Sequence, residues 1–197
     1  MYNIRTLNNI SEKGLNKFPK DEFEISDRME NPDGILLRSF DMHQMEIPES
    51  VKGIARAGAG TNNIPIDECS KRGIVVFNTP GGNANAVKEL VITGLLLSSR
   101  KVSQGIEWVK TLKDAEGDVS KATEAGKKQF VGPEIQGKTL GVIGLGAIGV
   151  LVANVAQKLG MDVIGYDPYL SIDAAWHLSS HVHKASSIED LVSKSDY

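Results

Sequence analysis

The sequence predicts an α/β protein with two parallel sheets, each flanked by helices. Short apolar runs of strand length alternate with short helical patterns through the first ninety residues. Residues 139–167 repeat this order as an apolar run, three glycines, a helical pattern and a second apolar run. Because strands that alternate with helices are usually joined by crossovers within one sheet, both regions predict parallel sheets. A long helical pattern at residues 87–112 separates them and predicts two domains.

Composition excludes several classes of protein. The chain has 197 residues, 41% of them hydrophobic, and a formal net charge of −3, so it lacks the basic surface typical of nucleic-acid or membrane-surface binding. The amino terminus has no apolar segment of a secretory signal, and the apolar stretch at residues 95–97 is far too short to span a membrane. The single cysteine, Cys69, cannot form an internal disulfide. We therefore expect a cytoplasmic globular protein whose partners include neither nucleic acid nor membrane.

The first ninety residues contain five expected strands and two expected helices. The strands are residues 2–7, 22–26, 34–37, 53–57 and 74–77, and the helices are residues 11–18, with Ser11 as N-cap, and residues 65–72, which Gly73 ends. Ligands of parallel sheets bind at the carboxyl ends of the strands. Arg38, Arg56 and the loop 58–63 follow such ends, so we expect them at a binding site.

A turn at residues 78–82 precedes the long helix, and we expect Asn83 or Asn85 to cap it. Apolar residues keep a 3.6-residue spacing through residues 87–112, which predicts one helix of about seven turns. This helix carries more apolar surface than one domain needs, and so it predicts a homodimer or a larger homo-oligomer. Residues 113–128 are charged and weakly patterned, which predicts a loop or a frayed helix.

Gly144, Gly146 and Gly149 form the pattern G-x-G-x-x-G between an expected strand, 140–143, and an expected helix, 150–159. The first glycine permits a tight turn off the strand, the second a close approach of the backbone to a pyrophosphate, and the third close packing of helix on strand. Unpaired N–H groups at the helix amino terminus favour the anion. Three glycines alone are a weak signal, but the flanking strands and helix in register predict a dinucleotide site.

The expected strand after this helix, residues 162–166, ends in Asp167. A carboxylate at this position accepts hydrogen bonds from a ribose diol and repels a 2′-phosphate. The next residue is Pro168, so no arginine follows the acid to receive a 2′-phosphate. The cofactor is therefore expected to be NAD rather than NADP.

Residues that could bind a metal or act as a nucleophile are better explained as structural. His177, His181 and His183 could bind zinc only if residues 177–181 were helical, and no neighbouring cysteine or carboxylate supports such a site. Exposed histidines in a loop are the favoured interpretation, so no metal is expected. Cys69 has no partner motif, and a partly buried small residue explains it better than a catalytic thiol.

The last thirty residues are less informative. Ser186-Ser187-Ile188-Glu189 resembles a capping box ahead of a helix at residues 188–193. Only two or three strands can be placed after residue 139, whereas a complete dinucleotide-binding sheet has about six. We therefore expect the chain to be the amino-terminal part of a longer protein.

Four segments carry a resemblance to a known family: residues 35–43, 54–67, 73–90 and 138–169. In their order and spacing, the chain resembles the amino-terminal half of the D-isomer-specific 2-hydroxyacid dehydrogenases. The resemblance implies a flavodoxin-like substrate domain at residues 1–90, followed at residues 91–197 by an incomplete Rossmann domain, a doubly wound parallel sheet that binds NAD. It also implies reversible hydride transfer between NAD and the carbon that bears the substrate hydroxyl.

The resemblance also implies roles for individual residues. The substrate, a small phosphorylated hydroxy acid, would be bound by Arg38, Ser39, Arg56, Ala57 and Gly58. Arginine suits phosphate and carboxylate because its planar fork donates two charge-assisted hydrogen bonds, and the glycine loop offers backbone N–H groups. From the residues alone, an ordinary surface arginine remains the alternative at both arginine positions. NAD would contact Ala59 near its nicotinamide, the turn at Gly144, Gly146, Ala147, Ile148 and Gly149 at its pyrophosphate, and Asp167 and Pro168 at its ribose.

No catalytic residue is expected within residues 1–197. In the family an arginine orients the carboxylate and polarises the ketone, and a histidine, kept charged by a glutamate, transfers the proton. The resemblance places all three after Tyr197, and none of the four histidines present matches. Two alternatives remain: another member of the family that acts on an unphosphorylated acid, and a corepressor-like NADH sensor that keeps the fold without the chemistry.

Overall fold

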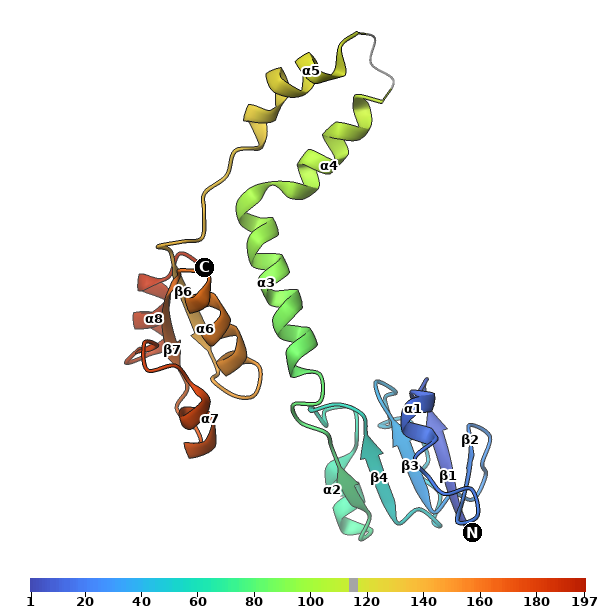
Figure 1. Ribbon diagram of the computed structural model, residues 1–197. Helices are drawn as coiled ribbons and strands as arrows, with labels where there is room; N and C mark the ends of the chain where they lie inside the picture. The colour runs from blue at the N-terminus through green and yellow to red at the C-terminus, as the bar shows by residue number, and fades with distance from the viewer. Residues whose placement is uncertain (114–116) are drawn as a thin grey trace. The chain divides into compact units, whose positions relative to one another are not determined.

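The computed structural model describes residues 1–113 and 117–197, which form two compact units. The first unit comprises Met1–Asn83 and the second Ala84–Tyr197. Each unit contains its own parallel sheet, as the strand–helix alternation predicts (Figure 1). The units are described separately below.

The first unit is built on a five-stranded parallel sheet whose strands lie in the order β2-β1-β3-β4-β5. The strands are β1 (Tyr2–Leu7), β2 (Phe23–Ser26), β3 (Gly34–Leu37), β4 (Gly53–Arg56) and β5 (Val75–Phe77). All four neighbouring pairs are parallel. This order is that of the flavodoxin-like doubly wound sheet, in which the chain reverses direction across the sheet between β1 and β3. The predicted fold class of this unit is confirmed.

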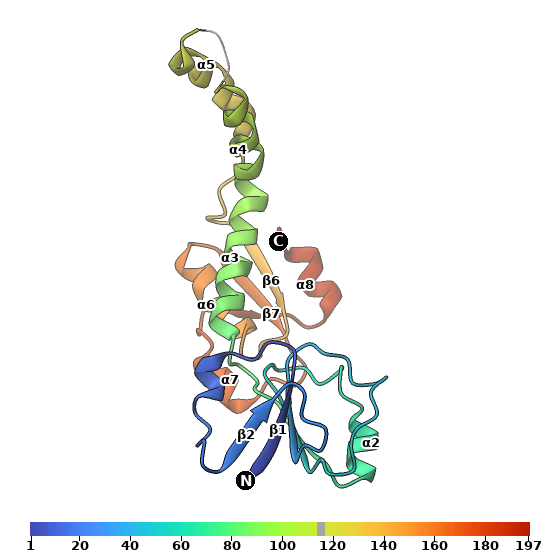
Figure 2. The same cartoon turned by 90° about the vertical axis from the view of Figure 1, so that its right-hand side faces the viewer.

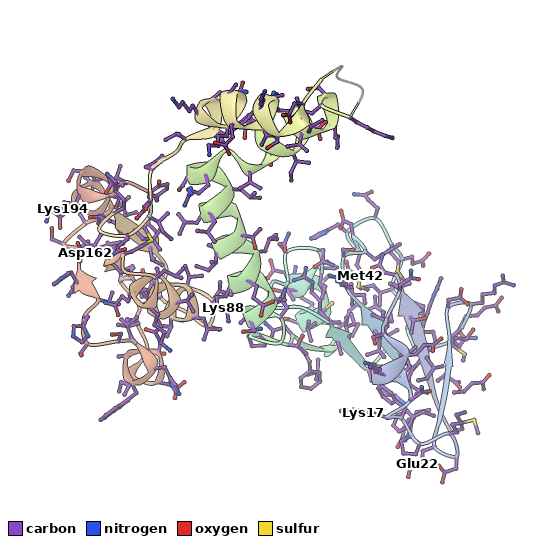
Figure 3. All side chains as sticks on the ribbon, turned by 45° about the horizontal axis from the view of Figure 1, so that its top comes forward. Lys17, Glu22, Met42, Lys88, Asp162 and Lys194 are labelled. Atoms are coloured by element: carbon purple, nitrogen blue, oxygen red, sulfur yellow. The ribbon has the colours of Figure 1, made fainter. Side chains whose placement is uncertain are left out.

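The core of the first unit lies on the central strands. Ile35 and Leu37 of β3 and Ile54 of β4 are fully buried, because alternate residues of a strand point to the same face. Met42, in the loop after β3 and labelled in Figure 3, is also fully buried in this core. Cys69 lies in the same cluster, so it is fully rather than partly buried.

Two short helices belong to the first unit. α2 (Ile66–Lys71) follows Pro65 and ends before Gly73, whose φ of 71° only glycine adopts easily. α1 (Glu12–Leu15) is shorter than the helix expected at residues 11–18, and Ser11 makes no capping hydrogen bond through its side chain. Gly14 weakens this helix, and Pro19 disfavours helical geometry at the residue before it.

The second unit contains a three-stranded parallel sheet in the order β6-β7-β8. The strands are β6 (Thr139–Ile143), β7 (Asp162–Tyr166) and β8 (His183–Lys184), and the helices around them are α6 (Gly149–Lys158), α7 (Ile172–His177) and α8 (Ile188–Lys194). Figures 1 and 2 show α6 and α8 on opposite faces of β6 and β7. Ala153 and Ala156 of α6 are fully buried, since small side chains let the helix approach the sheet closely.

The long helix expected at residues 87–112 is instead two helices. α3 (Ala84–Arg100) packs against α6, and α4 (Val102–Thr111) leaves its direction, as Figure 1 shows in green. The break lies at Lys101, which has left-handed φ and ψ of 48° and 33°. Apolar periodicity continues across this residue, so only tertiary contacts reveal the bend. One such contact is between the aromatic rings of Trp108 in α4 and Phe130, whose centroids lie 5.1 Å apart. Since α3 begins at Ala84, Asn85 lies inside the helix and does not cap it.

The segment expected as a loop or frayed helix is largely helical. α5 (Val119–Gly126) and the 3₁₀ helix η1 (Lys127–Phe130) account for most of it, while residues 114–116 lie outside the described residues. Asp118 caps α5, because its carboxylate accepts the backbone N–H groups of Ser120 and Lys121. That capping signal was present in the sequence but was missed.

The helix α8 has a capping arrangement shifted by one residue from the expected one. The Ser187 hydroxyl accepts the N–H of Asp190 at 3.1 Å, and the Asp190 carboxylate accepts the N–H of Ser186 at 2.9 Å. Asp190, not Glu189, is therefore the acidic partner. Throughout residues 1–113 and 117–197, no helix combines the length and apolar character that crossing a membrane requires.

Candidate functional site

A cleft of about 380 Å³ opens at the carboxyl edge of the first sheet. It is formed by the loops that follow β1, β3, β4 and β5, and therefore includes the point between β1 and β3 where parallel sheets of this order bind ligands. Its lining residues are Asn9, Ile10, Ser11, Arg38, Ala57, Gly58, Thr79, Gly82 and Asn83. The structure thus brings three of the predicted substrate residues, Arg38, Ala57 and Gly58, into one cavity.

Six lining residues were not predicted, and they come from the ends of β1 and β5. The rule that selected Arg38 and Arg56, a position just after a parallel strand, applies equally to Asn9 and Thr79. These residues were missed because asparagine and threonine are common in ordinary turns. Considering the polar side chains that follow every strand of a parallel sheet would have identified these lining residues.

The other two predicted substrate residues do not line the cleft. The backbone N–H of Ser39 donates to the side chain of Asn8 at 3.1 Å, which ties the loop after β3 to the end of β1. Nε of Arg56 donates to the carbonyl of Arg38 at 2.9 Å, and its Nη1 donates to the carbonyl of Gly60. In this arrangement the guanidinium of Arg56 binds two backbone carbonyls, whereas the exposed side chain of Arg38 faces the cleft.

A buried asparagine supports the loop that carries Arg38. The Asn63 amide nitrogen donates to the carbonyls of Arg38 and Phe40, at 3.2 and 2.7 Å. The backbone carbonyl of Asn63 accepts the N–H of Met42 at 2.9 Å. These bonds join the loops after β3 and β4, so the cleft wall is held by hydrogen bonds rather than by apolar packing alone.

The glycine turn in the second unit has the geometry that each glycine predicts. Gly144 leaves β6 with a φ of 88°, and a Cβ on Gly149 would clash with the Gly144 carbonyl. Around Gly146, a Cβ would meet no protein atom within 4 Å. The turn is therefore closed where α6 meets β6 and open at the position where a pyrophosphate would approach.

Backbone donors are available at this open side. Ala147 and Ile148 are exposed at the amino terminus of α6, and among the described residues their N–H groups have no hydrogen-bond acceptor. Donors of this kind at a helix amino terminus bind phosphate. Pro168 is exposed beside Asp167, and Ala59 lies in the loop after β4 of the first unit. Within the second unit, the residues present therefore fit a dinucleotide.

Asp167 is engaged with backbone on both oxygens. Its Oδ2 accepts the N–H of Leu145 in the glycine turn at 2.8 Å, and its Oδ1 accepts the N–H of Tyr169 at 2.8 Å. A carboxylate has about four acceptor sites, so lone pairs remain for a ribose diol. Leu145 itself is buried, and its side chain fills the space over Gly165 of β7.

The histidines of the second unit are not arranged around a metal. His177 ends α7 and Leu178 is extended, so the helix needed across residues 177–181 does not form. His177, His181 and His183 instead line a shallow pocket of about 860 Å³. Within the parts of the chain that the structure describes, no three His, Cys, Asp or Glu residues gather to hold a metal ion. Burial raises the pKa of the Cys69 thiol, which disfavours the reactive thiolate.

Comparison with known proteins assigns the family. Residues 94–197 match the sequence model described as "D-isomer specific 2-hydroxyacid dehydrogenase, NAD binding domain". The chain belongs to the D-isomer specific 2-hydroxyacid dehydrogenase family and carries its NAD-binding domain. NAD is accordingly its cofactor, as Asp167 and Pro168 after the glycine turn predict.

Individual relatives narrow the comparison. The D-3-phosphoglycerate dehydrogenase of Methanocaldococcus jannaschii is 34% identical over 177 residues, which cover 88% of this chain and 31% of that protein. The enzyme of the same name from Archaeoglobus fulgidus is 39% identical over 146 residues, 73% of this chain and 26% of that protein. The crystal structure of NAD⁺-bound 3-phosphoglycerate dehydrogenase from Entamoeba histolytica has a TM-score of 0.69 and 27% identity, and the match covers 98% of this chain and 60% of that one. The chain thus matches about a third or less of the length of these two curated relatives.

Proposed function

We propose that the protein is an NAD-dependent D-3-phosphoglycerate dehydrogenase, which oxidises 3-phosphoglycerate to 3-phosphohydroxypyruvate on the way to L-serine. The observation that carries the proposal is the cleft in which Arg38 and the Gly58 loop come together at the carboxyl edge of the first sheet. A guanidinium beside this loop suits a small acid with two anionic ends, because the N–H groups of Ala59 and Gly60, which follow Gly58, have no acceptor among the described residues. Relatives 34% and 39% identical bear the same enzyme name.

The proposal divides the work between the two units. The first would bind the substrate with Arg38, Ala57 and Gly58, whose loops Ser39 and Arg56 hold through backbone hydrogen bonds. The second would bind NAD through the glycine turn, Asp167 and Pro168. Arg38 supplies positive charge to phosphate or carboxylate, while loop N–H groups hold a carboxylate in a fixed direction. Asp167 selects a ribose without a 2′-phosphate because like charges repel.

The reaction transfers a hydride from the hydroxyl-bearing carbon and releases the hydroxyl proton as the ketone forms. NAD, when bound, accepts that hydride. This chain contributes binding and orientation, which lower the barrier by holding the reacting carbon in place. Among the described residues no histidine lines the cleft, so we assign proton transfer to none of the four histidines.

The direct test is an assay of the native full-length protein with NAD and 3-phosphoglycerate, followed by NADH absorbance. Formation of NADH supports the proposal. Turnover of lactate or glycerate but not of the phosphorylated acid would favour another 2-hydroxyacid dehydrogenase of the family. Binding of NADH without turnover of any acid would favour the corepressor-like sensor. The same series therefore separates all three functions.

We also propose that the protein forms a homodimer through α4. Val102, Ile106 and Val109 are exposed on this helix, and they border an open pocket of about 560 Å³ with Trp108 and Phe130. Apolar surface of this extent on a helix favours a self-complementary contact with a second copy. Sedimentation of the native protein tests this proposal.

A further inference from the structure

Three consecutive residues of the loop after β4, Gly58, Ala59 and Gly60, have their carbonyls engaged by the first unit. The Gly58 carbonyl accepts the N–H of Thr79 at 2.9 Å, and the Ala59 carbonyl accepts the side-chain amide of Asn78 at 2.6 Å. The Gly60 carbonyl accepts Nη1 of Arg56. Because donors from the protein hold these three oxygens, their negative ends are not free to repel an anion in the cleft.

Two N–H donors of the same three residues are left available. The N–H of Gly58 is bonded to the Arg56 carbonyl at 2.9 Å, whereas those of Ala59 and Gly60 have no acceptor among the residues that the structure describes. Consecutive free N–H groups beside engaged carbonyls make a donor-rich concavity of the kind that binds carboxylates. Ala59 and Gly60 directly follow Gly58, which lines the cleft, so the orientation of this loop sets where the two free donors lie relative to the cleft.

Arg56 connects this loop to the neighbouring one. Its Nε bonds the Arg38 carbonyl in the loop after β3, and its Nη1 bonds the Gly60 carbonyl in the loop after β4. The guanidinium lies against both glycines, since a Cβ on Gly60 would be 2.9 Å from Nη1 and one on Gly58 would be 3.5 Å from Cζ. Two donors of one rigid fork thus fix two backbone segments at once.

We infer that Arg56 is a positioning residue that holds the anion-binding loop and does not itself bind the substrate. Arg38 lines the cleft and Arg56 does not, so the two arginines divide recognition and support between them. The identity of the anion, 3-phosphoglycerate, rests on the proposed function. The support role rests only on the hydrogen bonds of the unliganded loop.

The test compares three lysine variants of the native protein. In Arg56→Lys the charge remains, but a single ammonium cannot reproduce the two-directional fork. Amide exchange of Gly58 and Thr79, measured by NMR without ligand, should accelerate about tenfold, and affinity for 3-phosphoglycerate should fall about tenfold. Arg38→Lys should weaken affinity while leaving exchange at both amides unchanged.

Arg72→Lys is the matched control. Nη2 of Arg72 also donates to a backbone carbonyl, that of Pro48 at 3.0 Å, but neither residue belongs to the loop after β4. It should change neither loop exchange nor affinity. If Arg56→Lys does not fold, as judged by urea unfolding, Arg56→Gln retains one donor and replaces it. Exchange at Gly58 and Thr79 equal to wild type would overturn the inference, whatever the affinity.

Failure of the two hypotheses can be distinguished. A wild-type protein that binds neither 3-phosphoglycerate nor another 2-hydroxy acid counts against the proposed function alone, since the exchange measurement needs no ligand. A wild-type protein that binds the acid, together with an Arg56→Lys variant that loses affinity but keeps normal exchange, would make Arg56 a direct ligand. That result would leave the function standing and refute the inference.

Discussion

Asp167 and Leu145 are joined by a 2.8 Å hydrogen bond that links the end of β7 to the glycine turn after β6. The backbone N–H of Leu145 donates to Oδ2, so the carboxylate that we propose to receive the ribose also restrains the turn that we propose to receive the pyrophosphate. A charge-assisted bond of this type is stronger than a neutral one. Two ends of the cofactor site are therefore coupled through one side chain.

This coupling predicts the behaviour of Asp167→Asn. The amide keeps the shape but has only one acceptor oxygen, so it cannot accept both the Leu145 and the Tyr169 N–H. We expect NAD affinity to fall about tenfold or more and the preference over NADP to narrow. Isothermal titration with both cofactors measures this. Asp173→Asn, at a side chain that is 91% exposed on α7, should leave both affinities unchanged; unaltered affinities in Asp167→Asn would refute its role.

The glycine turn predicts different outcomes for two alanine substitutions. Gly149→Ala places a methyl group against the Gly144 carbonyl, so it should destabilise the second unit by about 3 kcal/mol even without cofactor. Gly146→Ala meets no protein atom within 4 Å, so stability should stay within about 0.5 kcal/mol of wild type while NAD affinity falls. Urea unfolding and titration measure the two effects. Equal destabilisation by both substitutions would contradict this assignment.

Asp190 predicts a pH dependence of stability. The hydrogen bond from Lys194 (labelled in Figure 3), at 2.5 Å, and that from the Ser186 N–H lower the pKa of Asp190 from its ordinary 3.8 to about 2. The unfolded chain therefore binds the proton more tightly. The stabilisation is fully present above about pH 4 and is lost as the pH falls from about 4 to about 2.

Asp190→Asn should accordingly be less stable than wild type at pH 7 and equally stable near pH 2. Urea unfolding at several pH values between 7 and 2 measures how the difference in stability between wild type and variant decreases. Asp162→Asn is a suitable control, because Asp162 is exposed and its side chain makes no hydrogen bond to the described residues. A gap that stays constant with pH would show that the loss is not electrostatic.

The exposed surface of α4 predicts the effect of Ile106→Asp. Ile106 is 54% exposed, and a charge there should abolish the proposed dimer because an unpaired carboxylate would be buried at its interface. Sedimentation velocity of the native protein should show a dimer that becomes a monomer. Ile172→Asp alters an 80% exposed residue of α7 and should stay dimeric. A monomeric wild type, or a dimeric Ile106→Asp, would rule the interface out.

Sequence reasoning succeeded where the signal is local. The path from β6 through the glycine turn and α6 to Asp167 is one continuous segment, and the backbone geometry of its glycine turn depends on residues within that segment. The strands β1 and β3 were also predicted with the bounds that the structure shows, since alternating or continuous apolar runs are read within a few residues. The fold class follows from these elements because parallel strands need crossovers.

Tertiary structure alone decided the rest. The chain bends at Lys101 without proline or glycine, because contacts of α4 with η1 outweigh a periodicity that continues unbroken. The cleft likewise gathers loops from four strands, and hydrogen bonds from Arg56, Asn63 and Asn78 set its shape. The sequence by itself determined which residues carry charge or permit tight turns, since those properties belong to single residues. The hydrogen bonds of Arg56 to the carbonyls of Arg38 and Gly60 decided which of the two arginines faces the cleft, and a local sequence pattern does not reveal those bonds.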